Sequence, residues 1–280
     1  MTEKAPVNKI LPFSVVDGPG SRSTLFLQGC NFHCAYCHNP ETQQLCDNCG
    51  ACVPGCPAGA LSIVEGKVVW DDQRCALCDS CIKTCERHSS PRVRMMTPGE
   101  AYAKMRASIP FIRGITVSGG ECTLYTGFLL ELFRLAKNDG LSCLMDSNGS
   151  IDFGAHEQLV DISDGVMLDI KSWDPEIHQA LTGCDNSIVR RNLVYLAGKN
   201  KITELRIVCL QGEVDAETAI EGIAATLTPE DLKNLHLKLI RFRRFGVRGR
   251  LADTASPGLD YMRGLAARAA DAGIGHVLVV

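Results

Sequence analysis

The side chains with the greatest capacity for chemistry in this sequence are its cysteines. The chain has 15 cysteines in 280 residues, and eleven of them lie between Cys30 and Cys85. A cytosolic protein keeps its thiols reduced, so cysteines at this density are expected to bind metal instead of forming disulfides. Their spacing separates the eleven into two sets of four and one set of three, and the two kinds of set suit different chemistry.

The two sets of four have the same spacing, C-x2-C-x2-C-x3-C, and Pro57 follows the first whereas Glu86 follows the second. This is the spacing of bacterial ferredoxins, in which three thiolates of one loop bind a [4Fe-4S] cluster and the fourth cysteine crosses to the other cluster. Structural zinc is the alternative, because paired CxxC units also bind zinc. The repeated spacing favours two [4Fe-4S] clusters. The expected ligands are Cys46, Cys49, Cys52 and Cys85 for one cluster, and Cys75, Cys78, Cys81 and Cys56 for the other.

The segment that carries these eight cysteines, residues 46–86, is too short for a large hydrophobic core. We expect it to form an inserted domain that is like a bacterial ferredoxin and is held together by its two clusters. A cluster with four cysteine ligands has no open iron position. Electron relay and stability are therefore the expected roles of this domain, and the two roles are compatible.

The third set, Cys30, Cys34 and Cys37, has the spacing CxxxCxxC. Three ligands leave one iron of a [4Fe-4S] cluster open, and an open position is what separates catalytic from structural metal sites. The sequence therefore predicts a third cluster at which chemistry takes place. A structural cluster with a distant fourth ligand is the alternative that spacing alone leaves open.

The elements that must position these residues follow an α/β pattern, because short apolar runs alternate with longer amphipathic stretches beyond Met95. Six strands are predicted, which suits a partial (β/α)6, TIM-like barrel formed by residues 1–45 and 87–280. The predicted strands are Ser23–Leu27, Gly114–Ser118, Ser142–Asp146, Gly165–Asp169, Glu204–Val208 and Asn234–Ile240. Helices are expected to begin near Thr97, Gly127, His156, Pro175, Asn186 and Asp215, and a last helix over Pro257–Asp271 leads to an edge strand at His276–Val280.

Polar residues gather where the predicted strands end. In barrels of alternating strands and helices, reacting groups lie at the carboxyl ends of the strands. We therefore expect the clusters that follow four of the strands to share one site. They are Ser118–Glu121, Asp146–Gly149, Asp169–Lys171, and Arg241 with Arg243.

The cysteine set with Tyr36 before its last cysteine resembles the radical S-adenosylmethionine enzymes. The segments Asp17–Arg22, Phe26–Cys30 and Cys37–Pro40 resemble the glycyl-radical-enzyme activases, and the two-cluster insertion resembles the larger members of that family. The arginine-rich segment near Arg241 resembles the YjjW-type branch. The resemblance implies that S-adenosylmethionine binds the open iron and is cleaved reductively to methionine and a 5'-deoxyadenosyl radical, which removes hydrogen from a glycine of a partner glycyl radical enzyme. It also implies flavodoxin or ferredoxin as electron donor, and an anaerobic cytoplasmic setting.

The same resemblance assigns cofactor contacts at the strand ends. Gly119, Gly120 and Glu121 match the family's GGE motif, Asp146 and Asn148 match its D-T-N-G segment, and Asp169 and Lys171 match its DxK motif. Arg206 matches a position on the fifth strand, and Arg243 stands where a family member has a histidine that contacts the cofactor. Asp146 and Asp169 would hold a monovalent cation beside the cofactor, since oxygen ligands suit a hard cation.

Composition excludes some partners. A net charge of -3 produces no field that attracts nucleic acid, and no apolar run approaches the roughly 18 residues needed to cross a membrane. For the arginine run from Arg241 to Arg250 we rank cofactor or partner contact first, a solvated loop second and nucleic acid third. Two other functions stay open: a radical enzyme acting on a small molecule or RNA, and a non-catalytic electron carrier.

Overall fold

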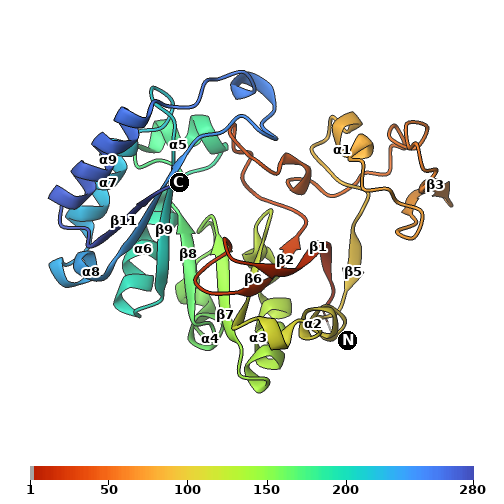
Figure 1. Cartoon of the computed structure of the whole chain (residues 1–280), viewed down its shortest axis with the longest axis horizontal. Coiled ribbons are helices and arrows are strands. Elements are labelled where there is room, and N and C mark those ends of the chain that lie inside the picture. Colours follow the sequence, from red (N-terminus) through yellow and green to blue (C-terminus); the bar gives the residue numbers. More distant parts are fainter. Residues whose placement is uncertain (1–2) are drawn as a thin grey trace.

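The computed structural model describes residues 3–280, in which one curved, mostly parallel sheet forms the centre (Figure 1). The nine strands of this described sheet lie in the order β11-β10-β9-β8-β7-β6-β2-β1-β5. Their bounds are β1 (Ala5–Ser14), β2 (Arg22–Leu27), β5 (Arg94–Met96), β6 (Gly114–Gly119), β7 (Ser142–Ser147), β8 (Gly165–Asp169), β9 (Ile202–Cys209), β10 (His236–Arg241) and β11 (His276–Val279). The predicted α/β class is confirmed.

The six predicted strands are β2, β6, β7, β8, β9 and β10, and they run parallel to one another. The expected edge strand is β11, which is parallel to β10. Strands β6 and β8 are buried almost throughout, as expected for parallel strands covered on both faces. Parallel strands bring their carboxyl ends to one rim, which is where the cysteine loop after β2 begins.

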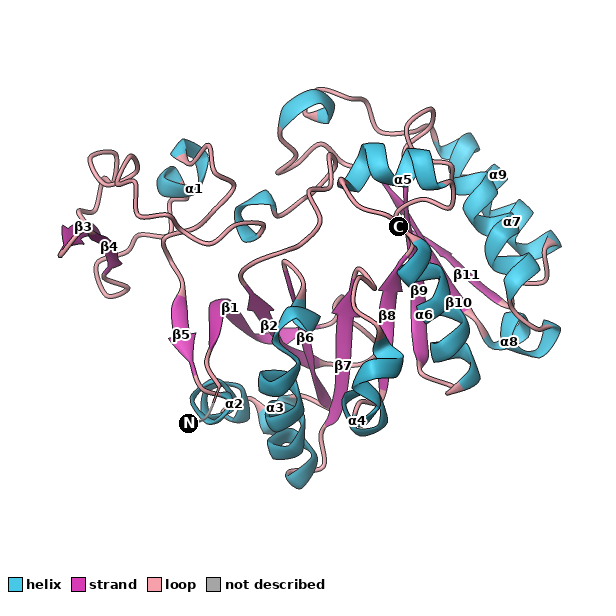
Figure 2. Cartoon of the chain, turned by 180° about the vertical axis from the view of Figure 1, so that it is seen from behind, coloured by secondary structure: helices cyan, strands magenta, loops and turns pink. Residues whose placement is uncertain are grey.

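Helices cover the outer face of the sheet, as Figure 2 shows for α3, α4 and α6. The helices of the barrel are α2 (Pro98–Arg106), α3 (Thr126–Asn138), α4 (Glu157–Ile162), α5 (Pro175–Thr182), α6 (Ser187–Gly198), α7 (Ala216–Thr226), α8 (Pro229–Asn234) and α9 (Leu259–Asp271). Short 3-10 helices are found at Pro40–Thr42, Ile109–Phe111, Cys122–Tyr125, Phe153–His156 and Gly249–Leu251. Thr97 caps α2 through a capping box with Glu100, which explains the start of that helix at Pro98.

Two elements differ from the prediction. Asn234 does not begin a strand but ends α8, because Thr228 and Asp231 form a capping box that starts a short helix at Pro229. Ala5–Ser14, for which no strand was predicted, forms β1, which is antiparallel to both β2 and β5. Its two prolines, Pro6 and Pro12, and the partly exposed residues of its second half suit a strand near the sheet edge.

Residues 46–86, called the insert below, lie to one side of the barrel (Figure 1). The insert contains a two-stranded hairpin, β3 (Leu61–Val64) with β4 (Lys67–Trp70), and the short helix α1 (Ser80–Thr84). Its hydrophobic centre of Cys52, Leu61 and Cys81 is separate from the large core of the barrel.

Within residues 3–280, no helix combines enough length with enough apolar character to cross a membrane.

Candidate functional site

A cavity of about 240 Å³ opens at the carboxyl ends of the parallel strands. It brings together most of the residues singled out from the sequence, although they come from five different parts of the chain. The predicted residues that line it are Cys30, Cys34, Cys37, Gly119, Gly120, Asp146, Asn148, Asp169, Lys171 and Arg206. Three of the four strand-end clusters expected to share one site thus contribute to this cavity, and Arg241 with Arg243 does not.

The three cysteines of this cavity are partly buried, and their thiols are placed to serve as metal ligands. Burial raises the pKa of Cys30 to about 12 and that of Cys34 to about 11, so bare thiolates would be costly there. Iron supplies the positive charge that makes deprotonation favourable. The backbone amide of Phe32 and the side-chain amide of Asn148 approach Cys30 Sγ at 3.4 and 3.7 Å. This donor set fits a cluster bound through three sulfurs.

The cysteine loop is held by backbone hydrogen bonds from both sides. The amides of His33 and Ala35 each donate at 2.8 Å to carbonyls at the end of α5. On the other side, the amide of Cys30 donates to the carbonyl of Gln43 at 2.8 Å. Because these contacts use only main-chain atoms, the fold positions the loop without depending on the cysteine side chains.

Gly119 and Gly120 bring the end of β6 against the end of β2. The Gly120 amide donates to the Leu27 carbonyl at 2.9 Å, and Gly119 has a φ of +124°, which favours glycine. A Cβ atom at Gly119 would collide with the backbone of Leu27, and one at Gly120 with the backbone of Gly29. Both glycines are therefore required by the approach of two backbones at the floor of the cavity.

The predicted cofactor contact of Glu121 is not seen, because its carboxylate does not reach the cavity. The side chain is 1% exposed and accepts hydrogen bonds from the Asn148 amide at 2.7 Å and from the Ser147 hydroxyl at 2.9 Å. It also accepts from Thr123 at 2.5 Å. Burial raises the pKa of Glu121, although these hydrogen bonds oppose the rise. Glu121 therefore positions the Ser147–Asn148 segment, and the sequence motif could not reveal in which direction its side chain points.

Asp146 forms the centre of a charged network inside the cavity. Its carboxylate contacts Arg206 at 2.8 Å and accepts from the Ser118 hydroxyl at 2.9 Å. Glu204 contacts the same guanidinium at 2.5 Å. Burial raises the pKa of Asp146, Arg206 opposes the rise and the charge of Asp169 adds to it.

Asp169 and Lys171 form the second charged pair of the cavity, with 2.6 Å between Oδ2 and Nζ. Burial disfavours the ammonium of Lys171, but the Asp169 carboxylate together with the charges of Cys34 and Tyr36 outweighs this effect and raises the pKa of Lys171 well above its usual range. The Lys171 carbonyl accepts from the Tyr36 hydroxyl at 3.3 Å, which links the pair to the cysteine loop. Both aspartates thus have basic partners, and the monovalent cation between them stays a prediction.

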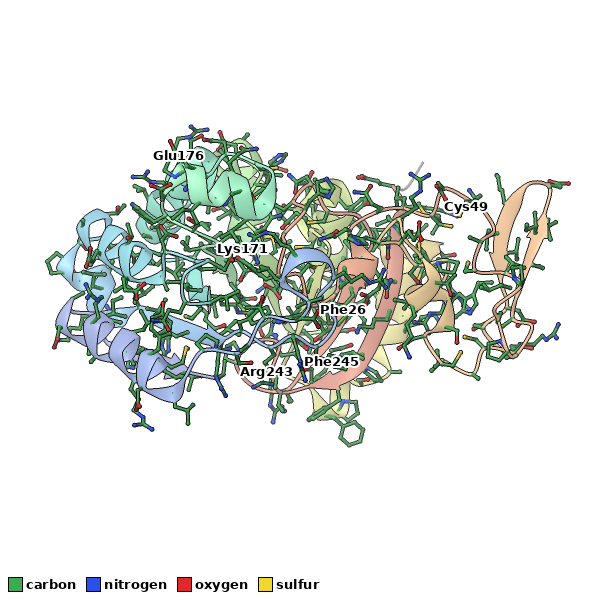
Figure 3. All side chains as sticks on the ribbon, turned by 90° about the horizontal axis from the view of Figure 1, so that it is seen from above. Phe26, Cys49, Lys171, Glu176, Arg243 and Phe245 are labelled. Carbon is green, nitrogen blue, oxygen red and sulfur yellow. The ribbon has the colours of Figure 1, made fainter. Side chains whose placement is uncertain are left out.

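Arg243 is outside the cavity, contrary to the expected cofactor contact. Its side chain is exposed, and Figure 3 shows it beside Phe245, away from Lys171. The backbone turns at this point so that the neighbouring Phe242 is buried, which sends the side chain of Arg243 outward. The cavity is bordered instead by His38, whose Nε2 contacts the Arg243 carbonyl at 2.7 Å.

Several further residues of the cavity were not predicted as contacts. They are Phe32, His38, Asn39, Thr42, Gln43, Ser147, Val208 and Ile240. Most lie within a few positions of a predicted residue, so proximity in sequence was the available signal. Gln43 and Thr42 are exceptions, because the 3-10 turn at Pro40–Thr42 returns the chain to the cavity.

The cysteines of the insert surround two pockets in crossed sets. The first pocket is lined by Cys46, Cys49, Cys52 and Cys85. The second is lined by Cys56, Cys75, Cys78 and Cys81. Within residues 3–280 no three Cys, His, Asp or Glu side chains converge closely enough to hold a single metal ion. In each pocket the thiols instead border a shared space, in the same grouping as the expected ligand sets.

The segment Asp17–Arg22 lies at the opposite end of the strands from the cavity. Arg22 is 2% exposed and donates to the Ile115 carbonyl at 2.7 Å and to the Ser142 carbonyl at 3.0 Å. Arg22 therefore fastens the starts of β6 and β7 to β2. In this structure the arginine of the motif stabilises the barrel and does not line the site.

A solved structure shares this fold. Streptococcus suis SuiB bound to S-adenosylmethionine superposes with a TM-score of 0.56 at 13% identity, over 90% of this chain and 48% of SuiB, which shows likeness of fold alone. The fold and the site together define a protein that binds a metal cluster at the rim of a partial barrel. The profile of the Radical SAM superfamily matches residues 24–220, and the chain belongs to that superfamily. Membership implies a [4Fe-4S] cluster and S-adenosylmethionine as cofactors.

The relatives narrow the class further. A Haemophilus influenzae protein provisionally named a glycyl-radical enzyme activating enzyme is 29% identical over 297 residues, covering 98% of this chain and 96% of the relative. The choline trimethylamine-lyase activating enzyme of Oleidesulfovibrio alaskensis is 28% identical, with coverage of 87% and 85%. The pyruvate formate-lyase-activating enzyme of Streptococcus mutans is 29% identical, with coverage of 75% and 67%. The resemblance to glycyl-radical-enzyme activases is confirmed.

Proposed function

We propose that this chain activates a partner glycyl radical enzyme by removing a hydrogen atom from one of its glycines. The observation that carries the proposal is the convergence of three cysteines with the glycine turn and two charged pairs in one cavity. When bound, the reduced cluster would give one electron to the sulfonium of S-adenosylmethionine, and its S–C5' bond would break into methionine and the 5'-deoxyadenosyl radical that takes the glycine hydrogen.

The residues of the chain hold and orient the reactants. Cys30, Cys34 and Cys37 would bind three irons and leave the fourth for the amino and carboxylate groups of S-adenosylmethionine. Lys171 and Arg206 are buried cations that suit a carboxylate, and Gly119 and Gly120 expose backbone atoms to the cavity. The side chains that line the cavity are partly buried, and they would therefore limit the access of water to the radical.

We infer that the insert is a domain like a two-cluster ferredoxin and relays electrons to this site. The crossed arrangement of its eight cysteines around two pockets supports this inference. Flavodoxin or ferredoxin would supply the electron. An anaerobic cytoplasmic setting suits such clusters, because thiols stay reduced there and oxygen attacks iron–sulfur centres.

The experiment is anaerobic incubation of the reconstituted protein with S-adenosylmethionine, a low-potential reductant and candidate glycyl radical enzymes. We expect a glycyl radical doublet in the electron paramagnetic resonance spectrum of one candidate, together with 5'-deoxyadenosine. The Cys34→Ala variant is the control and should give neither product.

Two other outcomes would favour the rival functions. Production of 5'-deoxyadenosine with no glycyl radical in any protein partner would support action on a small molecule or RNA. Failure to cleave S-adenosylmethionine with a fully assembled cluster would support a non-catalytic electron carrier.

A further inference from the structure

The insert and the barrel meet at a junction built around Arg248, which lies in the loop between β10 and α9. Its guanidinium donates to the Cys85 carbonyl and to the Ile82 carbonyl, each at 2.6 Å. These carbonyls lie at the C-terminal end of α1, and the Ile82 carbonyl also accepts from the Cys85 amide at 3.2 Å. A side chain of the barrel thus binds the backbone of one expected cluster ligand in the insert.

The first cysteine set also meets the barrel through the chain on either side of it. The Gln44 amide donates to the His88 carbonyl at 3.0 Å, and His88 Nδ1 contacts Gln43 Oε1 at 3.0 Å. Gln43 in turn lines the cavity, and its carbonyl accepts from the Cys30 amide at 2.8 Å. Gln44 and His88, close in sequence to Cys46 and Cys85, therefore connect the first cysteine set to the cysteine loop through hydrogen bonds.

Basic side chains gather at this junction. Burial lowers the pKa of His88, and the charges of Arg248 and His33 lower it further. The second cysteine set has different surroundings, because its pocket is lined by Trp70 and Arg92, and Arg92, which follows the insert in sequence, pairs with Asp79 at 2.6 Å. The two sets of the insert are therefore not equivalent with respect to the barrel.

We propose that Arg248 is a positioning residue that holds the first cysteine set against the cysteine loop, so that the cluster of Cys46, Cys49, Cys52 and Cys85 passes electrons to the site. In each transfer this cluster loses one electron and the cluster of Cys30, Cys34 and Cys37 gains it. A low-potential flavodoxin or ferredoxin then replaces the electron. The proposal rests on the proposed function for its redox partners, and it names the point at which the electron enters the barrel.

A positive charge beside a cluster favours the reduced form, because reduction adds negative charge. Replacing Arg248 with Gln should therefore lower the reduction potential of one insert cluster and leave the site cluster unchanged. Arg248→Lys should restore much of the potential, since it keeps the charge. A merely structural clamp would leave the potential of every cluster unchanged.

The test compares Arg248→Gln, Arg248→Lys and Arg244→Gln, the last being an exposed arginine of the same loop. Iron and sulfide contents are measured first, and cluster potentials are then obtained by titration followed by electron paramagnetic resonance. Rapid-freeze spectra follow reduction of the site cluster, whose signal alone should change when S-adenosylmethionine binds. Flavodoxin and photoreduced deazaflavin, a small donor able to reach the site directly, serve as reductants.

We expect Arg248→Gln to slow flavodoxin-dependent reduction of the site cluster at least tenfold, to lower one potential, and to leave reduction by deazaflavin unchanged. Arg244→Gln should behave as the wild type. An unchanged flavodoxin rate, or equal losses with both donors, would overturn the proposal. The measurement follows reduction of the site cluster, so it requires neither cleavage of S-adenosylmethionine nor a partner enzyme. Failure of the proposed function would be detected separately, as wild-type protein that forms no glycyl radical in any candidate partner.

Discussion

The cysteine set of the barrel and the two sets of the insert are supported in different ways. The barrel set lies on a loop tied by main-chain hydrogen bonds to α5 and to Gln43, above a large apolar core. The insert has a buried centre of only Cys52, Leu61 and Cys81, and two of these residues are expected ligands. We therefore expect the barrel to form its site before a cluster binds, and the insert to depend on bound clusters for its own shape.

The largest expected effect comes from exchanging a cysteine in each region. Cys34→Ala should reduce cleavage of S-adenosylmethionine to the background rate with any reductant, because the site cluster loses a ligand. Cys56→Ser should retain cleavage with an artificial reductant and lose it with flavodoxin. The measurement is 5'-deoxyadenosine formed anaerobically, and equal losses with both reductants in Cys56→Ser would contradict the relay.

Removal of iron should separate the two regions structurally. After anaerobic chelation, we expect amides of residues 46–86 to lose protection from hydrogen exchange, because metal binding and folding are coupled in small metal-dependent domains. Amides of β6, β7 and β8 should stay protected. If the insert retained its protection without iron, its small core would be sufficient and the comparison would fail.

An ion pair is also expected to contribute differently to the free energy of unfolding in the two regions. Arg206→Met would leave the buried Asp146 without its basic partner and should lower the free energy of unfolding by about 3 kcal/mol. Arg87, 3.4 Å from Asp47 of the insert and largely exposed, is the matched control, and Arg87→Met should leave the free energy of unfolding nearly unchanged. Denaturant titrations of both variants test this difference.

The smallest effect concerns pH and the support of the cysteine loop. Burial lowers the pKa of His178 below 6.5, and its Nδ1 contacts the Cys184 carbonyl at 2.8 Å beside Phe32 of the cysteine loop. The unfolded chain thus binds a proton that the folded protein does not, so this contribution to stability is present above pH 6.5 and is lost as pH falls toward the folded pKa.

In His178→Gln the free energy of unfolding should therefore fall less steeply below pH 6.5 than in the wild type, and the difference should be less than about 1 kcal/mol. Unfolding curves of the wild type and the variant at several pH values provide the measurement. Parallel curves for the two proteins would show that His178 does not titrate in this range.

Much of the fold and site could be predicted because the signals are local. Ligand spacing in a short loop, as at Cys30 and Cys34, follows from the size of a cluster, and strands such as β6 and β8 are continuous apolar runs. The helix start at Thr97 is likewise a local hydrogen-bonding pattern. Strand β1 was not predicted, because its two prolines and its irregular burial give no such pattern.

Side-chain direction could not be predicted in the same way. Glu121 and Arg243 both follow strands at the site rim, yet Glu121 points into the protein and Arg243 points to solvent. One is turned by hydrogen bonds to Ser147 and Asn148, the other by burial of Phe242. In each case the deciding neighbours are outside the motif.

The sequence by itself determined two cysteine sets of four, one cysteine set of three, and a parallel sheet whose strand ends converge. These features can be read from the sequence because spacing and periodicity are properties of short segments. Only the tertiary structure decided which charges pair, as Asp146 with Arg206, and where the insert meets the barrel, at Arg248 and Cys85. The physical reason is distance along the chain. Residues 60 and 163 positions apart meet only after the sheet and its loops have packed.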